Sequence, residues 1–261
     1  MTVRMRALCA VVLGLVPLVA AGAGAAPAPR DLVADVERAR AQRRIDVPGV
    51  SADVVIGLSS PSWQGTGTCQ GRLVARRPGK LRLQGYAAVL TVFDAGTDGE
   101  RFWVYIPALD RAIVGAAGEE SLLVALPILP GEIVAALFGE PYGAPEGGLR
   151  AMTVDGKPGV AWTLPDSQEV RARYRSGPTL IERAELWRGE TRVARLDYHD
   201  YRKRKGVWWP TRIDFDWPAT QSHLSLTFDT VAFDEAIPAT TFQFTAPEGV
   251  TVVSPDAAVA Q

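Results

Sequence analysis

Few side chains in this sequence carry the chemistry of a catalytic or metal site. The two histidines, His199 and His223, have no further ligand at the spacings that metal sites use. The alternation of apolar and polar residues around His199 predicts that its imidazole points to the wet face of a strand. His223 begins a strand between Ser222 and Ser225, but no G-x-S-x-G turn is present to expose a nucleophile. A Ser-His-Asp set could form only if the fold assembled it from distant residues.

The cysteines are also unlike those of a reactive site. Residues 66–69 read TGTC, which matches no nucleophile motif, so we expect Cys69 to be a half-buried structural thiol. Cys9 follows Arg6-Ala7-Leu8, a charged context unlike that of a lipidation cysteine. The sequence also lacks a phosphate-binding loop and a dinucleotide fingerprint. We therefore expect no enzymatic activity, no cofactor and no metal.

Length and charge limit the classes of protein. A chain of 261 residues, 47% of them hydrophobic, can bury the core of one large domain or two small ones. The formal net charge of −1 argues against a nucleic-acid partner, which clustered Lys and Arg would bind. The one basic run, residues 202–205, follows Asp197 and Asp200 and is typical of a solvated turn.

The N-terminal residues have the pattern of an export signal. Arg4 and Arg6 form a positive region, residues 7–19 form a short apolar region, and small residues follow. The A-x-A pattern predicts cleavage after Ala25 and leaves residues 26–30 as a linker. The apolar run is shorter than the ~20 residues that span a bilayer and contains Pro17. We expect a soluble protein in the periplasm, without a lipid anchor and with Cys69 as its only thiol.

The stretch from residue 76 to residue 106 predicts an antiparallel meander. Its three strands are expected at residues 80–84, 89–93 and 102–106, where branched, aromatic or alternating residues gather. Pro78-Gly79 and Asp98-Gly99 supply the turns between them. The second and third strands are apolar at both alternating positions, so the pattern leaves open which of their faces is inward.

Two segments have the pattern of helices. Residues 31–43 carry an amphipathic pattern, with Asp31 as a plausible N-cap and arginines near the end. Residues 131–138 form a second, strongly apolar helix that Gly139 and Pro141 end. That segment is too short and too interrupted to span a membrane. It must therefore cover another apolar surface.

From residue 149 onward the alternation becomes regular, as residues 194–199, 212–217 and 224–229 illustrate. Such alternation is typical of an antiparallel sheet with one dry and one wet face. We count roughly ten to twelve strands without a linker between them. The sequence therefore predicts a mainly β (α+β) fold, with one curved sheet and one or two helices in its concavity.

The order of these elements resembles the LolA/LolB family of bacterial lipoprotein carriers over residues 31–253. Four segments carry the resemblance: LRLQGYAAVLTVFD (81–94), LPILPGEIVAALFGEP (126–141), VWWPTRIDF (207–215) and FQFTAPEGVTVV (242–253). The resemblance implies a single domain, followed by a flexible tail at residues 254–261. It implies an unclosed antiparallel β-barrel of about eleven strands, with helices lidding a concave face that accepts acyl chains.

The same resemblance suggests a lipid cavity and a lid. For the cavity we expect residues of the meander: Leu81, Leu83, Leu90, Val92, Trp103 and Tyr105. For the lid we expect residues of the second helix: Ile133, Val134, Leu137 and Phe138. LolB-type proteins have a protruding leucine in a loop that corresponds to Tyr86 and Ala87 here, so we expect these two residues in a membrane-facing loop, although neither is leucine.

The function that the resemblance implies is that of a soluble, monomeric periplasmic carrier. It would bind the acyl chains of a lipoprotein or another lipid for transfer to the outer membrane, between an inner-membrane exporter and an outer-membrane acceptor. One alternative is an envelope protein-binding or sensing module of the same fold without lipid transport, whose interior would be packed shut. Another is a hydrolase whose site only the fold assembles.

Overall fold

The computed structural model describes residues 31–61, 65–117, 129–143, 148–175, 177–234 and 236–255. These residues belong to one compact unit that begins at Asp31. The predicted signal peptide (1–25), the linker (26–30) and residues 256–261 of the predicted tail lie outside the described residues. None of the described helices combines the length and the apolar character that a membrane span requires.

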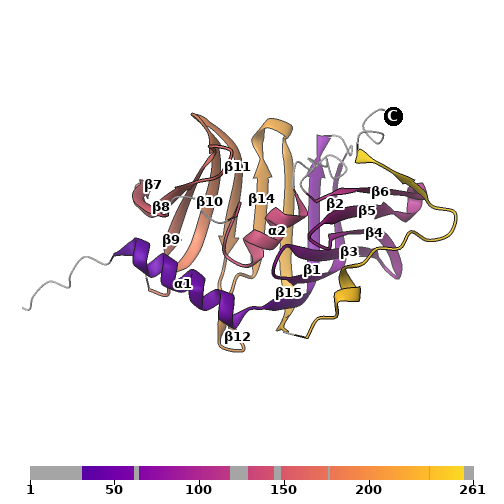
Figure 1. The fold of residues 1–261 in the computed structure, drawn as a ribbon, viewed down its shortest axis with the longest axis horizontal. Helices are drawn as coiled ribbons and strands as arrows, with labels where there is room; N and C mark the ends of the chain where they lie inside the picture. The colour runs from indigo at the N-terminus through magenta and orange to yellow at the C-terminus, as the bar shows by residue number, and fades with distance from the viewer. Residues whose placement is uncertain are drawn as a thin grey trace, which may run out of the picture. The chain divides into compact units, whose positions relative to one another are not determined.

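A fourteen-stranded sheet is the main element of the fold (Figure 1). In spatial order its strands are β16 (Thr251–Val253), β6 (Arg111–Ala116), β5 (Arg101–Ile106), β4 (Leu90–Thr97), β3 (Lys80–Ala87), β2 (Gly65–Arg76), β1 (Gly49–Ser60), β15 (Ser222–Phe233), β14 (Arg212–Trp217), β11 (Thr191–His199), β10 (Leu180–Arg188), β9 (Glu169–Arg175), β8 (Lys157–Thr163) and β7 (Arg150–Val154). Neighbouring strands are antiparallel, except that β16 pairs parallel with β6. The first and last strands do not pair with each other in the described residues, so the sheet is unclosed.

The expected mainly β fold with an unclosed antiparallel sheet and helices is confirmed, but the strands are more numerous than the implied eleven. Two further strands, β12 (Arg202–Arg204) and β13 (Val207–Trp209), form a separate hairpin. The basic run at residues 202–205, which we expected to be a turn, supplies the first strand of this hairpin. Strands of three residues, such as β16, are too short to show a recognisable alternation in the sequence.

The strand register gives the sheet one continuous apolar face. Leu83 lies opposite Leu73 on one side and Ala95 on the other, and side chains of directly opposed residues share a face. In the other half of the sheet, Phe215 lies between Leu196 and Leu224 in the same manner. We call this surface the inner face.

Two long strands join the two halves of the sheet. β1 and β15 contain twelve residues each and pair with each other, and their register shifts where Asp229 of β15 forms a β-bulge opposite Asp53 and Val54. A bulge adds local twist and bends the strand. The strands on the two sides of this pair run in different directions. In Figure 1, β3 to β6 lie nearly horizontal, whereas β9 to β11 stand nearly upright.

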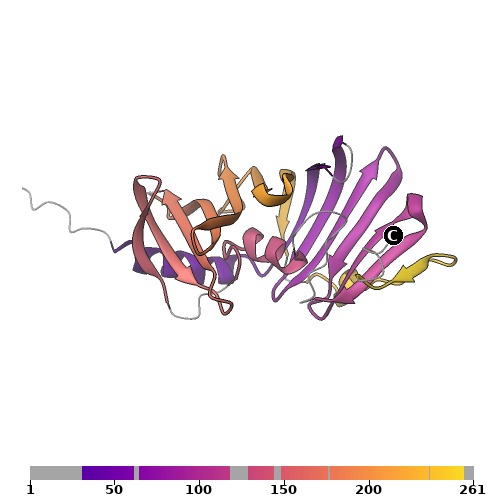
Figure 2. The same cartoon turned by 90° about the horizontal axis from the view of Figure 1, so that it is seen from above.

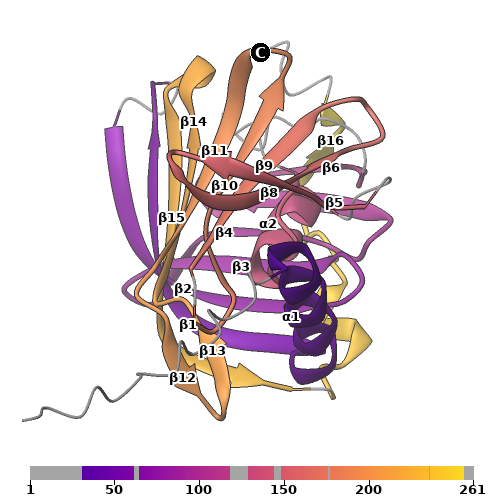
Figure 3. The same ribbon diagram turned by 90° about the vertical axis from the view of Figure 1, so that its left-hand side faces the viewer.

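Two helices lie on the inner side of the sheet. Helix α1 (Leu32–Asp46) begins at the predicted N-cap Asp31, whose carboxylate accepts from the Ala34 amide, and it contacts β7 and β8. Helix α2 (Pro130–Leu137) lies between the part of the sheet formed by β1 to β6 and the part formed by β7 to β11 (Figure 2). Both helices lie on the same side of β14 and β15 (Figure 3).

The C-terminal segment covers the outer face of β2 to β6. Its 3-10 turn η4 (Ala239–Phe242) buries Phe242 against Val74 and Ile237. Beyond it, Phe244 stacks on Trp103 with ring centroids 5.8 Å apart. Two further turns, η2 (Pro107–Leu109) and η3 (Pro218–Thr220), connect β5 to β6 and β14 to β15.

The contact between Gly96 and Trp103 on the outer face gives a test of this register. A Cβ atom at Gly96 would lie 2.3 Å from the Leu81 carbonyl oxygen and 2.6 Å from an atom of the Trp103 ring. We expect Gly96→Ala to lower the free energy of unfolding by about 1–3 kcal/mol, because overpacking forces the neighbours to move. Gly67→Ala is the control, since a Cβ there meets nothing within 4 Å. Urea unfolding followed by tryptophan fluorescence measures both, and equal stabilities of the two variants would contradict the register.

Candidate functional site

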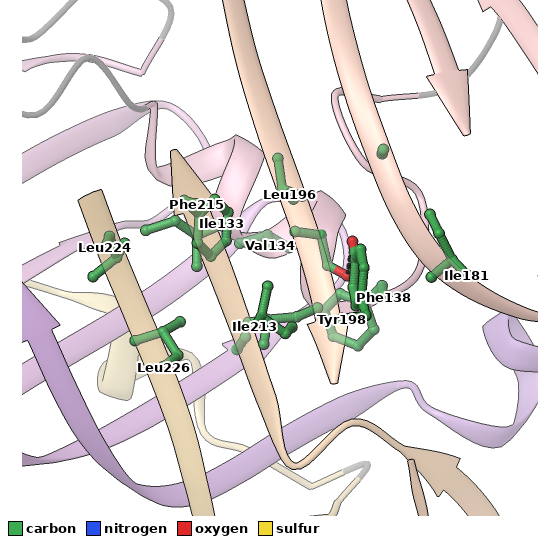
Figure 4. Packing of buried hydrophobic residues seen from close by; sticks show 14 of the residues in the cluster. Ile133, Val134, Phe138, Ile181, Leu196, Tyr198, Ile213, Phe215, Leu224 and Leu226 are labelled. Atoms are coloured by element: carbon green, nitrogen blue, oxygen red, sulfur yellow. Dashed lines mark hydrogen bonds between the residues drawn. The ribbon is translucent and has the colours of Figure 1, made fainter. Parts of the chain in front are cut away.

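The candidate site is the inner face of the sheet together with the helix that fills it. Buried side chains from both halves of the sheet join those of α2 in one core cluster. Figure 4 shows Ile133 and Val134 of α2, and Phe138 at its C-cap, packed among residues of β11, β14 and β15. Such a surface offers no reactive group, and its chemistry is the burial of apolar chains.

Helix α2 is apolar around most of its circumference. Its start is fixed by Pro130 and by Glu132, whose carboxylate accepts from the Leu129 amide at 3.0 Å. Its end is followed by Gly139, which has a φ of 76°. All four predicted lid residues are at most 4% exposed and come together against the inner face: Ile133, Val134, Leu137 and Phe138.

The C-terminal end of α2 is held by polar side chains from other elements. Arg43 of α1 donates to the Leu137 carbonyl at 3.0 Å, and Arg77 donates to the Phe138 carbonyl at 3.1 Å. The Tyr198 hydroxyl donates to the Ala136 carbonyl at 3.1 Å. The last carbonyls of a helix have no partner within it, and cations are favoured there. We call this set of three contacts the latch.

Glu140 extends the latch beyond the end of the helix. Its carboxylate accepts from Arg44 at 2.6 Å and from Arg77 at 2.9 Å. Burial alone would raise the pKa of the Glu140 carboxyl, but the hydrogen bonds and charges of the two arginines outweigh it and hold the pKa below its ordinary value. Glu140 therefore stays ionised and ties the segment after α2 to α1.

The six predicted cavity residues do not share one face. Leu81 and Leu83 lie buried on the inner face and belong to the core cluster with α2. Trp103 and Tyr105 point to the outer face, where Phe244 covers them. Trp103 lies opposite Gly96, which lies opposite Arg82, so its side chain faces away from Leu81 and Leu83. β5 is apolar at both alternating positions, so the sequence pattern could not show that Trp103 and Tyr105 face outward.

The remaining two predicted cavity residues are exposed. Leu90 is 71% exposed, because it stands at the turn between β3 and β4. Val92 is 41% exposed and lies at the register shift between these strands, where no residue pairs with it. The structure therefore does not bring Leu90 and Val92 to the surface that Leu81 and Leu83 form.

The turn between β3 and β4 carries the predicted membrane-facing loop. Tyr86 is partly buried and its hydroxyl donates to Gln84, while Ala87 is exposed. Among the large apolar residues that the structure describes, Val89 is the most exposed, at 93%; it follows Ala88, which has a φ of 53°. Leu109 of η2 is also 63% exposed, and η2 contacts β4. We call Val89, Leu90 and Leu109 the turn patch; the sequence reasoning did not single out Val89 or Leu109.

The residues with possible chemistry lie away from the inner cluster or are inert. His199 and His223 both face Asp214, at 2.9 and 3.6 Å, and both imidazoles are exposed. Ser225 lies opposite Asp214 but has no hydrogen bond to either imidazole in the described part of the chain. Burial raises the pKa of the Cys69 thiol, which disfavours the reactive thiolate. Within the described ranges, no group of three or more His, Cys, Asp or Glu residues could hold a metal ion.

Comparisons with known proteins identify the fold. No protein-family model and no curated protein sequence matches this chain. The structure is similar to that of a DUF1329 family protein from Desulfovibrio piger, with 14% sequence identity and a TM-score of 0.58 over 82% of this chain and 98% of that one. It is also similar to a LolA superfamily protein from Nitrosomonas europaea, with 14% identity and a TM-score of 0.55 over 81% of this chain and 97% of that one.

A third similar structure is a domain described as an outer membrane lipoprotein-sorting protein, from Vibrio parahaemolyticus. It has 14% identity and a TM-score of 0.51 over 80% of this chain and 94% of that one. Together the three structures show that this chain has a LolA/LolB-like fold.

The hydrogen bond from Arg77 predicts that the local stability of α2 depends on this side chain. We expect Arg77→Gln to speed amide hydrogen exchange of residues 133–138 by roughly ten- to hundredfold, because hydrogen bonds to charged groups contribute about 1.5–3 kcal/mol. Arg72→Gln, at an exposed position of β2, is the control and should leave these rates unchanged. Hydrogen-exchange mass spectrometry measures both variants. Unchanged exchange of α2 in Arg77→Gln would show that Arg77 does not hold the helix.

Proposed function

We propose that this protein is a periplasmic carrier that binds the acyl chains of a lipoprotein or another lipid against the inner face, in the place that α2 now occupies. The observation that carries the proposal is an apolar helix of eight residues seated in the middle of an open sheet and held at its end by polar contacts. The LolA/LolB-like fold supports it, as does the lipoprotein-sorting description of one similar structure.

The energetics of such a site are balanced. Burying an acyl chain of ~16 carbons gains roughly 13 kcal/mol at about 0.8 kcal/mol per CH₂. The four lid side chains gain about 1.5–3 kcal/mol each in their present positions, or roughly 6–12 kcal/mol together. Displacing α2 therefore offsets between about half and nine-tenths of the gain from the acyl chain. A carrier with this balance can both take up and release its cargo, and it needs no covalent chemistry.

The turn patch suits contact with a membrane. Val89, Leu90 and Leu109 leave branched apolar side chains in water. Leu90 begins β4, Val89 directly precedes it, and Leu109 belongs to η2, which contacts β4. Large exposed apolar residues gathered in this way are typical of interaction surfaces. We place this end of the sheet against the outer membrane during unloading. In this scheme a monomer is loaded by an inner-membrane exporter and delivers to an outer-membrane acceptor.

One observation favours the alternative of an envelope protein-binding or sensing module. Leu137 and Phe138 are at most 1% exposed, so the inner face in their vicinity is packed shut. In such a module α2 would stay in place permanently. The two functions differ in whether acyl chains compete with α2.

Competition between α2 and an acyl chain can be measured by titration with a fluorescent fatty acid. Because the apparent dissociation constant equals the intrinsic one divided by the open fraction, a weaker latch should raise the apparent affinity. We expect Arg77→Gln to bind the probe more tightly than the wild type, by the factor by which its α2 exchange accelerates. Arg72→Gln should bind as the wild type does. Absence of saturable binding in all three proteins would favour the protein-binding module.

The turn patch is tested by transfer of a bound fluorescent lipid to vesicles. We expect Leu90→Asp to slow transfer roughly tenfold or more, since burying a leucine side chain in a membrane gains about 1.5–3 kcal/mol. Binding of the probe before transfer should not change. Ile45→Asp is the control, because Ile45 is 72% exposed but lies on α1. Equal transfer rates for the two variants would remove the turn patch from the proposal.

A further inference from the structure

A small pocket with both apolar and polar lining residues lies beneath α1, next to the end of α2. Its volume of about 40 Å³ has room for roughly three water molecules or one small oxyanion. Its walls come from α1, β9, β10, β11 and the residues that follow α2 and β11. The side chains with polar groups are those of Arg40, Arg43, Tyr174, Thr179, Tyr198 and Tyr201.

The pocket walls contain several buried donors without partners. Arg40 is only 9% exposed, and its Nε and Nη2 atoms make no hydrogen bond. The Nε of Arg43 and the hydroxyl of Tyr174 are also buried and unpartnered. By contrast, the hydroxyls of Tyr198 and Tyr201 donate to the carbonyls of Ala136 and Ile181. Buried donors in folded proteins almost always have partners, so this group calls for an acceptor.

The pocket also carries uncompensated positive charge. Neither Arg40 nor Arg43 forms an ion pair with a carboxylate among the described residues; each guanidinium stacks on a tryptophan instead, Trp162 or Trp209. Burial lowers the pKa of the Arg43 guanidinium, as expected for a cation removed from water. Water in the pocket would satisfy hydrogen bonds but leave these charges without a counterion.

The carboxylates in the vicinity are already engaged. Asp46, whose charge favours the Arg43 cation, accepts a hydrogen bond from the Gln42 amide. Glu140 accepts from Arg44 and Arg77, and Glu182 pairs with Arg173 and Arg175. Burial raises the pKa of the Tyr174 hydroxyl, and both the charge of Arg40 and the approach of its guanidinium to the hydroxyl oxygen oppose the rise. The hydroxyl therefore stays protonated at physiological pH, and its O–H group remains free to donate. The pocket therefore presents donors and positive charge without a free carboxylate from these neighbours.

We propose that this pocket is an oxyanion site that binds a phosphate or phosphate-ester group between Arg40, Arg43 and Tyr174. Guanidinium groups present planar pairs of donors that match phosphate oxygens, and charge-assisted hydrogen bonds of this kind are the strong ones. Either free phosphate or the phosphate of a lipid headgroup supplies that chemistry. The inference does not depend on acyl binding to the inner face.

Arg43 links the pocket to α2. Its two terminal nitrogens donate to the carbonyls of Trp208 and Leu137, which leaves Nε for the pocket. Gly139 permits this approach, because a Cβ there would lie 3.1 Å from the Arg43 Cδ. An anion in the pocket and the end of the lid therefore share one guanidinium group.

Isothermal titration calorimetry of the mature protein with inorganic phosphate, at constant ionic strength in sodium chloride, tests the site. We expect saturable binding that Arg40→Gln weakens by about ten- to hundredfold, because a charged donor is lost. Arg38→Gln is the control, since Arg38 lies on the same helix with its side chain 75% exposed. Tyr174→Phe, which removes only the free hydroxyl, should also weaken binding and serves if Arg40→Gln fails to fold.

A second titration distinguishes the sources of the phosphate group. Dihexanoyl phosphatidic acid that binds much more tightly than inorganic phosphate would identify a lipid headgroup as the occupant, and equal affinities would identify free phosphate. The proposal is overturned if phosphate binds no better than chloride, or if Arg40→Gln and Tyr174→Phe both bind phosphate as the wild type does. The pocket would then hold water only.

Discussion

An open sheet with an apolar inner face must cover that face, and this constraint organises the whole molecule. The fourteen strands do not close, so residues such as Leu83, Leu196 and Phe215 would meet water if nothing lay over them. Helix α2 covers them with the side chains of Ile133, Val134, Leu137 and Phe138. In the proposed carrier, the apolar surface that α2 covers is also the surface that an acyl chain would use. Packing of α2 and binding of an acyl chain would therefore compete for one face.

The polar contacts at the end of α2 fix the position of this helix. Apolar contacts are not directional, so they do not by themselves fix the rotation or position of α2 on the inner face. The hydrogen bonds from Arg43, Arg77 and Tyr198 fix where the carbonyls at its C-terminal end lie. These contacts come from three separate elements, so the position of α2 depends on α1 and on both halves of the sheet. The outer face is covered by Phe242 and Phe244 of the C-terminal segment. Arginines hold backbone carbonyls there too, since Arg76 donates to the Ile237 carbonyl and Arg82 to the Thr241 carbonyl.

Much of the fold could be predicted from the sequence, but the assignment of residues to faces could not. Regular alternation in residues 194–199 and 212–217 identified the antiparallel sheet, and the apolar run at residues 131–138 identified α2. β5 is apolar at successive positions, so only pairing with β4 decides that Trp103 faces outward. The latch and the pocket under α1 were also beyond prediction. Both depend on hydrogen bonds between side chains and the backbone carbonyls of distant residues. Every residue has a backbone carbonyl, so no sequence pattern indicates which one a side chain will contact.

We propose that acyl chains bind where α2 now lies. Native mass spectrometry of the protein purified from its natural host, followed by organic extraction and identification of lipids, tests this most directly. Acyl binding at this position predicts a population with the added mass of an acylated species, recovered in the extract. A protein that shows only its bare mass, and that also fails to take up a fluorescent fatty acid, would contradict it.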